Sequence, residues 1–81
     1  MVKVQLVYTK MCPHCPPAKE LFRELEKEYR FDYKEIDAMT PEGQKLVEKH
    51  SIMSVPTVII NDTVAFVGLP SKEKAIQAIR G

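Results

Sequence analysis

Cys12 and Cys15 are the only cysteines of this 81-residue chain, and Pro13 and His14 separate them. Two thiols at this spacing can act in turn, one attacking a substrate disulfide while the other stays close enough to release the product. We predict that Cys12 forms a mixed disulfide with the substrate and that Cys15 then attacks Cys12 to free the reduced substrate. The pattern therefore indicates reversible thiol–disulfide exchange.

The attacking sulfur must be ionised, because only the thiolate attacks a disulfide, so Cys12 needs a lowered pKa and access to solvent. We expect Cys12 to be the N-cap of a helix, where unpaired N–H groups and the helix dipole favour negative charge. Lys10 and His14 add positive charge nearby, and Pro13 stiffens the turn at the first helical position. Cys15 is expected one turn inward, beneath Cys12 and shielded from solvent.

Two other uses of the thiols remain open at this point. A zinc site takes about four ligands, and the chain offers only Cys12, Cys15, His14 and the distant His50. A structural disulfide across two residues closes too small a loop to stabilise the fold by much. Redox chemistry is therefore favoured over metal binding and over a structural cross-link.

The cysteines lie between a predicted strand and a predicted helix. Alternating apolar residues precede them, and an apolar stripe of helical spacing begins at Ala18. Because Pro17 would forfeit a hydrogen bond in a helix starting at Pro13, we expect a distorted first turn and regular helix from about Pro17 or Ala18. On the polar face of this helix, Glu20 and Arg23 are spaced to form an ion pair.

The remaining elements follow from caps, turns and apolar patterns. Thr40 and Pro41 predict a helix start, Asn61-Asp62 a hairpin turn, and Ser71 the cap of a last helix. The elements are strand 2–8, the helix after the cysteines, strand 31–37 at a sheet edge, helix 41–50, buried strand 57–60, strand 63–67 and a helix after residue 71. The order βαβαββα predicts one α/β domain over residues 1–81, a four-stranded mixed sheet flanked by three helices.

Composition narrows the classes of function and partner. The formal net charge is +1, from 12 basic and 11 acidic residues, and without a basic block nucleic acid is not expected as a ligand. No apolar run has the length of a membrane span, and the N-terminal residues alternate in polarity, unlike a signal peptide. We expect a cytoplasmic protein, because a lone close-spaced thiol pair suits a reducing compartment. We also expect it to be a monomer.

Three short segments together resemble those of a known superfamily. They are Cys12-Pro13-His14-Cys15, Val55-Pro56-Thr57 and Phe66-Val67-Gly68. The chain resembles the thioredoxin/glutaredoxin superfamily over essentially its whole length, and most closely the small, glutaredoxin-sized thioredoxins of archaea. The resemblance implies a thioredoxin fold and a protein disulfide reductase that carries electrons with no cofactor besides its own redox-active disulfide.

The resemblance also implies a binding groove for substrate proteins. The Val55–Pro56 bond would be cis and would turn the Val55 backbone outward to pair with an extended substrate segment, while Pro56 obstructs metal binding near the sulfurs. The groove would serve disulfide-containing client proteins, and a thioredoxin reductase-type protein would supply electrons. The residues expected to bind the substrate in this groove are Met11, Val55, Pro56, Thr57, Gly68 and Leu69.

The chain departs from its relatives at two places. The alternative function, a glutaredoxin-like glutathione-dependent disulfide oxidoreductase, is typically marked by Gly-Gly and an acid after the hairpin, whereas this chain has Gly68-Leu69-Pro70-Ser71. Larger thioredoxins have a buried acid before the motif, and residues 2–9 contain none, which leaves water or His14 to accept the proton of Cys15. Since His14 also favours the thiolate, we predict a less reducing potential than the roughly −270 mV of thioredoxin.

Overall fold

The four strands form one mixed sheet in the order β2-β1-β3-β4, as seen in the computed structural model of this chain, which describes residues 1–80. The predicted domain ends at Gly81, which lies outside the described residues. The strands are β1 (Lys3–Tyr8), β2 (Asp32–Asp37), β3 (Thr57–Ile60) and β4 (Thr63–Val67), and the helices are α1 (Cys15–Glu28), α2 (Pro41–His50) and α3 (Lys72–Arg80). The predicted βαβαββα order and the four-stranded mixed sheet are confirmed.

Strand directions decide which loops share an end of the sheet. β1 runs parallel to β2, β3 is antiparallel to β1, and β4 is antiparallel to β3. One row of the sheet therefore aligns Val7, Thr57 and Val67, near the ends where β1 and β4 finish and β3 begins. The loops that follow β1, β2 and β4 and the loop that precedes β3 all emerge at this end.

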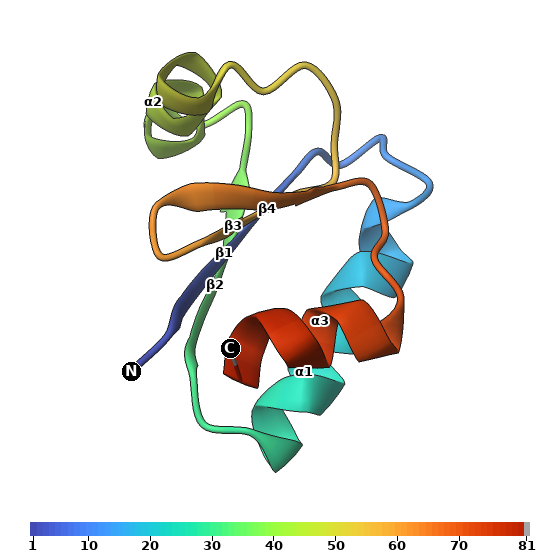
Figure 1. Cartoon of the computed structure of the whole chain (residues 1–81). Coiled ribbons are helices and arrows are strands. Elements are labelled where there is room, and N and C mark those ends of the chain that lie inside the picture. The colour runs from blue at the N-terminus through green and yellow to red at the C-terminus, as the bar shows by residue number, and fades with distance from the viewer. Residues whose placement is uncertain (81) are drawn as a thin grey trace.

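The sheet is covered on both faces, so each central strand is buried on two sides (Figure 1). On one face Leu6 and Val58 pack with the apolar stripes of α1 and α3. On the other face Val7 and Ile59 pack with α2 through its half-buried Leu46 and Val47. This arrangement explains why β3 is a continuous apolar run, as expected for a strand without a solvent face.

Local signals set most of the element boundaries as predicted. The Thr40 hydroxyl accepts a hydrogen bond from the Gly43 N–H at 3.1 Å, so Thr40 caps α2. The Ser71 hydroxyl accepts one from the Lys74 N–H at 3.2 Å at the start of α3. Asn61 and Asp62 both have positive φ values, 50° and 67°, as a tight turn between antiparallel strands requires.

Candidate active site

Cys12 and Cys15 form a disulfide in the segment that leads from β1 into α1, with their Cα atoms 5.3 Å apart. The Cys12 N–H donates to the Thr9 carbonyl, and the Cys15 N–H donates to the Cys12 carbonyl, each at 3.4 Å. Cys15 is 1% exposed, whereas Cys12 is partly exposed. The two sulfurs are thus chemically unequal, since only Cys12 is open to a large substrate.

The helix that follows the disulfide does not start where the sequence predicts. α1 begins at Cys15 and His14 is its N-cap, so the expectations that Cys12 is the N-cap and that Pro13 is the first helical residue are wrong. Regular helix also begins earlier than the expected Pro17 or Ala18, at Cys15. Pro16 and Pro17 lie in the first turn, where N–H groups have no partner within the helix, so the helix loses no hydrogen bond to them.

The shift of the N-cap from Cys12 to His14 changes the electrostatics around the disulfide. Pro13, Pro16 and Pro17 have no N–H, and the Cys15 N–H already donates to the Cys12 carbonyl. The helix terminus therefore offers the sulfur of Cys12 fewer free N–H groups than we expected. Lys10 and His14, both exposed, are the cationic or ionisable side chains nearest to it in the sequence.

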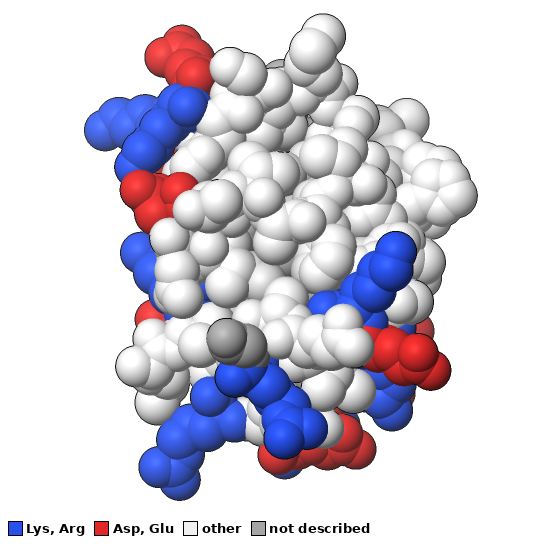
Figure 2. Space-filling model, viewed as in Figure 1, with Lys and Arg blue, Asp and Glu red and all other residues white. Residues whose placement is uncertain are grey.

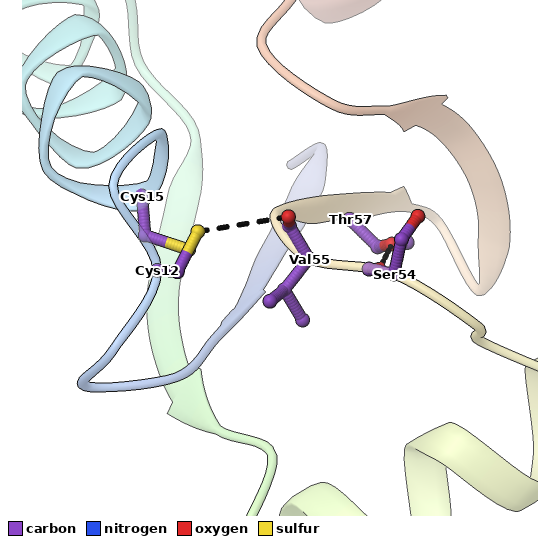
Figure 3. Close-up of a disulfide and its surroundings, with 5 residues drawn as sticks. All are labelled: Cys12, Cys15, Ser54, Val55 and Thr57. Carbon is purple, nitrogen blue, oxygen red and sulfur yellow. Dashed lines mark hydrogen bonds between the residues drawn. A yellow bond between two sulfur atoms is a disulfide. The ribbon is translucent and has the colours of Figure 1, made fainter.

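The loop before β3 brings a carbonyl oxygen to the disulfide. Figure 3 shows the Val55 carbonyl facing the Cys12 sulfur, and the distance from Sγ to O is 3.6 Å. The Val55–Pro56 bond is cis, as the resemblance implies. Two hydrogen bonds hold this loop: the Thr57 hydroxyl donates to the Ser54 carbonyl, and the Gly68 N–H donates to the Pro56 carbonyl, each at 2.7 Å.

The residues predicted to line the docking groove differ in their exposure. Met11 is 91% exposed and Leu69 is 48% exposed, while Val55 and Gly68 are half-buried. Pro56 and Thr57 are both buried. The Thr57 hydroxyl is used inside the loop that presents Val55, and Thr57 itself lines a hollow beside that loop.

Exposed apolar side chains gather at the end of the sheet that carries the disulfide. Among residues 1–80, six large apolar side chains are exposed, and all except Met1 belong to segments at this end. The five are Met11, Met39, Met53, Val67 and Leu69. Figure 2 shows a largely uncharged surface over β4 and the neighbouring loops, with Lys, Arg, Asp and Glu along its left margin, below it and at its lower right.

Met39, Met53 and Val67 were not among the predicted site residues. They lie in different segments of the sequence, and the sheet topology alone brings them to one end. Met53 and Val67 also line a hollow of about 250 Å³ next to the loop before β3. No local signal in the sequence marked them, because the neighbours Ala38, Ile52 and Val55 are also apolar and pack against the core.

A charged cluster connects α1 to the edge strand β2. Arg23 donates two hydrogen bonds to the Glu35 carboxylate, at 2.7 and 2.8 Å, and the Tyr33 hydroxyl donates a third at 2.8 Å. We expected Arg23 to pair with Glu20 along its own helix, but Arg23 pairs with Glu35 of β2 instead. Burial opposes the ionisation of Glu35, but these hydrogen bonds and the Arg23 charge outweigh it and lower the pKa of the carboxyl. Burial, followed by the bond to Glu35, raises the pKa of Tyr33.

Lys19 makes a separate contact close to the active-site segment. Its Nζ lies 3.4 Å from the centre of the Tyr8 ring, a cation–π contact. Tyr8 is the last residue of β1, and Lys19 lies one helical turn beyond Cys15. The contact fixes the start of α1 against the end of β1, the two elements that hold the disulfide.

The sheet order, the disulfide between β1 and α1 and the cis-proline loop facing it define a thiol–disulfide oxidoreductase with a thioredoxin fold. Residues 2–80 match the family described as the thioredoxin domain, and the chain belongs to that family. Within residues 1–80, no group of three or more His, Cys, Asp or Glu side chains is placed to hold a metal ion. In the same range, no helix combines the length and apolar character that crossing a membrane requires.

Curated relatives from archaea resemble the whole chain. A thioredoxin of Methanocaldococcus jannaschii is 39% identical over 80 residues, which cover 98% of this chain and 93% of the relative. A probable thioredoxin of Methanothermobacter thermautotrophicus is 37% identical over 81 residues, with the same coverage of both chains. These relatives support the thioredoxin interpretation, and the glutaredoxin alternative is not favoured.

Solved structures agree with this assignment. A thioredoxin-2 described as a component of malaria parasite protein secretion machinery superposes with a TM-score of 0.83 and 27% identity, covering 99% of this chain and 82% of that one. A protein disulfide oxidoreductase from Aeropyrum pernix superposes with a TM-score of 0.79 and 27% identity, covering 98% of this chain and 36% of that larger one. The fold and its association with thiol–disulfide exchange are thus shared with characterised proteins.

Proposed function

We propose that the chain is a protein disulfide reductase in which Cys12 attacks the client and Cys15 resolves the mixed disulfide. The observation that carries this proposal is the unequal exposure of the two sulfur residues, with Cys15 buried and Cys12 partly open beside Val55. A client sulfur can approach Cys12, whereas Cys15 can be reached only from Cys12. The order of the two attacks follows from this difference in access.

The two steps balance as a transfer of two electrons and two protons. The Cys12 thiolate attacks one client sulfur, the client disulfide breaks, and the released client thiolate takes up a proton. Cys15 then loses its proton and attacks the Cys12 sulfur, which releases the second client sulfur as a thiolate that takes up a proton. The client disulfide is reduced to two thiols, and the Cys12–Cys15 disulfide forms again.

The client is positioned by the loop before β3 and by the apolar surface around the disulfide. An extended client segment would pair with the backbone of Val55, a half-buried residue, as in strand addition. Met11 and Leu69, together with the exposed Met53 and Val67, would contact apolar side chains of the client. Flexible methionine side chains suit this role, because they adapt to client segments of different shape.

The disulfide must be reduced again after each turnover, because the pair of thiols holds only two electrons. We assign this step to a thioredoxin reductase-type donor, which the similarity to archaeal thioredoxins supports. Reduction of client disulfides suits the cytoplasm, where thiols are kept reduced. The chain is proposed to work there as a monomer, with its own disulfide as the only redox group.

Trapping variants test the order of the two attacks. Cys15→Ser should accumulate a mixed disulfide with a client such as insulin, seen as a band that reducing agent removes on electrophoresis. Cys12→Ser should form no such band and should not accelerate insulin reduction by dithiothreitol. If Cys12→Ser traps the client or keeps turnover, the assignment of the two cysteines is wrong.

The choice of reductant tests the remaining alternative. Insulin reduction should proceed when dithiothreitol regenerates the dithiol and should fail with glutathione at the same thiol concentration. Equal rates with both reductants would favour the glutaredoxin-like function.

A further inference from the structure

Met11 and Met53 are the two most exposed large apolar side chains among residues 1–80, at 91% and 96%. They belong to the two loops that meet at the disulfide. Met11 directly precedes Cys12, and Met53 lies two residues before Val55, whose carbonyl oxygen is 3.6 Å from the Cys12 sulfur. Two thioethers are therefore presented to solvent on the loops that a client must contact.

The surroundings of Met53 extend this surface away from the disulfide. Met53 lines the hollow of about 250 Å³ together with Val64 and Val67 from the edge strand β4. A client side chain that entered this hollow would contact the Met53 side chain. A polar group on the Met53 sulfur would then lie against apolar atoms and would have to be desolvated, which opposes docking.

We propose that Met11 and Met53 are oxidation sites at which a hydroperoxide weakens client docking while leaving the disulfide intact. This inference rests on the proposed function, because it concerns the surface that receives the client. The thioether sulfur takes the terminal oxygen of the hydroperoxide, whose O–O bond breaks and which leaves as an alcohol or as water. The sulfur is oxidised by two electrons to a sulfoxide, and the peroxide is reduced by the same two.

The oxidation state of the cysteines separates this modification from damage to the dithiol. In the disulfide state, neither Cys12 nor Cys15 carries a thiolate, which is the form that peroxide attacks. The exposed thioethers stay open to peroxide in that state. A chain that has just reduced a client is in the disulfide state, so peroxide oxidises the methionines of its docking surface before it oxidises the cysteines.

The other two methionines provide a matched control. Met1 is 83% exposed near the N-terminus, at the opposite end of the sheet (Figure 1), and Met39 is 74% exposed at the disulfide end but in the loop between β2 and α2. Both should be oxidised by the same treatment. They belong to neither of the loops that carry Cys12 and Val55.

The experiment treats the disulfide form of the full chain with hydrogen peroxide and counts the added oxygens by mass spectrometry of its peptides. After removal of peroxide, kcat/KM is measured for insulin and for a small aromatic disulfide, with dithiothreitol as the reductant. Three chains are compared, each with its own untreated sample: the unsubstituted chain, Met11→Leu/Met53→Leu and Met1→Leu/Met39→Leu. Leucine keeps the apolar volume but has no sulfur to oxidise.

We expect oxidation to lower kcat/KM for insulin by roughly tenfold, about 1.4 kcal/mol, in the unsubstituted chain and in Met1→Leu/Met39→Leu. Met11→Leu/Met53→Leu should lose less than about twofold. The small disulfide needs little docking, so its reduction should change in none of the three chains.

Loss of insulin reduction in oxidised Met11→Leu/Met53→Leu, or no loss in the oxidised unsubstituted chain, would overturn the inference. These outcomes differ from failure of the proposed function, which would appear in the untreated chain as inactivity towards insulin.

Discussion

The sulfur of Cys12 lies 3.6 Å from the carbonyl oxygen of Val55, although the two residues are 43 positions apart in the sequence. In the disulfide this sulfur has no proton to donate. In the reduced thiol its S–H can donate to the carbonyl, whereas a thiolate would face the partial negative charge of the oxygen. The contact therefore favours the thiol, and positive charge near Cys12 is needed to favour the reactive thiolate.

His14 is the first candidate for that charge, and we predict that His14→Ala makes the reduction potential more negative. His14 is the N-cap of α1, but its side chain makes no capping hydrogen bond, so alanine should leave the helix start in place. Loss of an ionisable imidazole beside the sulfurs destabilises the thiolate and hence the reduced form. We expect a shift of about 30 mV, roughly tenfold in the exchange equilibrium.

The potential is measured by equilibration of the disulfide with a glutathione redox buffer. Lys27→Ala removes an exposed cation farther along the same helix and should leave the potential unchanged. A shift of equal size in both variants would show that general surface charge, and not His14, sets the potential.

Gly43→Ala should destabilise the fold, although alanine is the better helix former. Helix propensity alone would favour alanine by about 1 kcal/mol. A Cβ at position 43 would, however, clash with the Asp37 carbonyl oxygen and would lie 2.7 Å from the Ala38 Cα, both backbone atoms. Because backbone cannot move aside easily, we expect a net loss of about 2 kcal/mol in the free energy of unfolding.

Urea unfolding followed by circular dichroism measures this loss. Lys45→Ala, at an exposed position of the same helix, is the matched control and should change stability by less than about 0.5 kcal/mol. A more stable Gly43→Ala protein would mean that α2 can shift away from the loop after β2.

Glu35→Gln should lower stability at neutral pH but not in acid. The pKa of Glu35 is lower in the folded state, where Arg23 and Tyr33 donate hydrogen bonds to its carboxylate. A carboxyl group with a lowered pKa contributes stability that is present above its unfolded pKa of about 4.3 and is lost as pH falls through the folded pKa. The difference from the unsubstituted chain should therefore be largest near pH 7 and should shrink below about pH 4.

The free energy of unfolding is measured for both proteins across this pH range. Glu24→Gln, at an exposed position on α1, should give a nearly flat difference. A Glu35→Gln difference that stays constant down to acid pH would show that the side chain contributes through packing and not through its charge.

The elements of the fold were predictable because their signals are local. Thr40 and Pro41 mark the first residues of α2, Ser71 caps α3, and the pair Asn61-Asp62 forms the hairpin turn. Each of these signals acts through the backbone of a few neighbouring residues. The start of α1 was mispredicted because three prolines in five positions made two local rules compete, and the rule for first-turn prolines decided the outcome.

The sequence by itself determined the chemistry of the site, because two thiols separated by two residues come together wherever the chain turns into a helix, and the local pattern predicts that turn. Only the tertiary structure decided which sulfur is open, which carbonyl faces it and which apolar side chains surround it. Val55, Met53 and Val67 reach the disulfide end through the pairing of β3 with β1 and β4, which brings together residues far apart in the chain. Strand pairing and burial depend on the whole core, so no local pattern of residues specifies them.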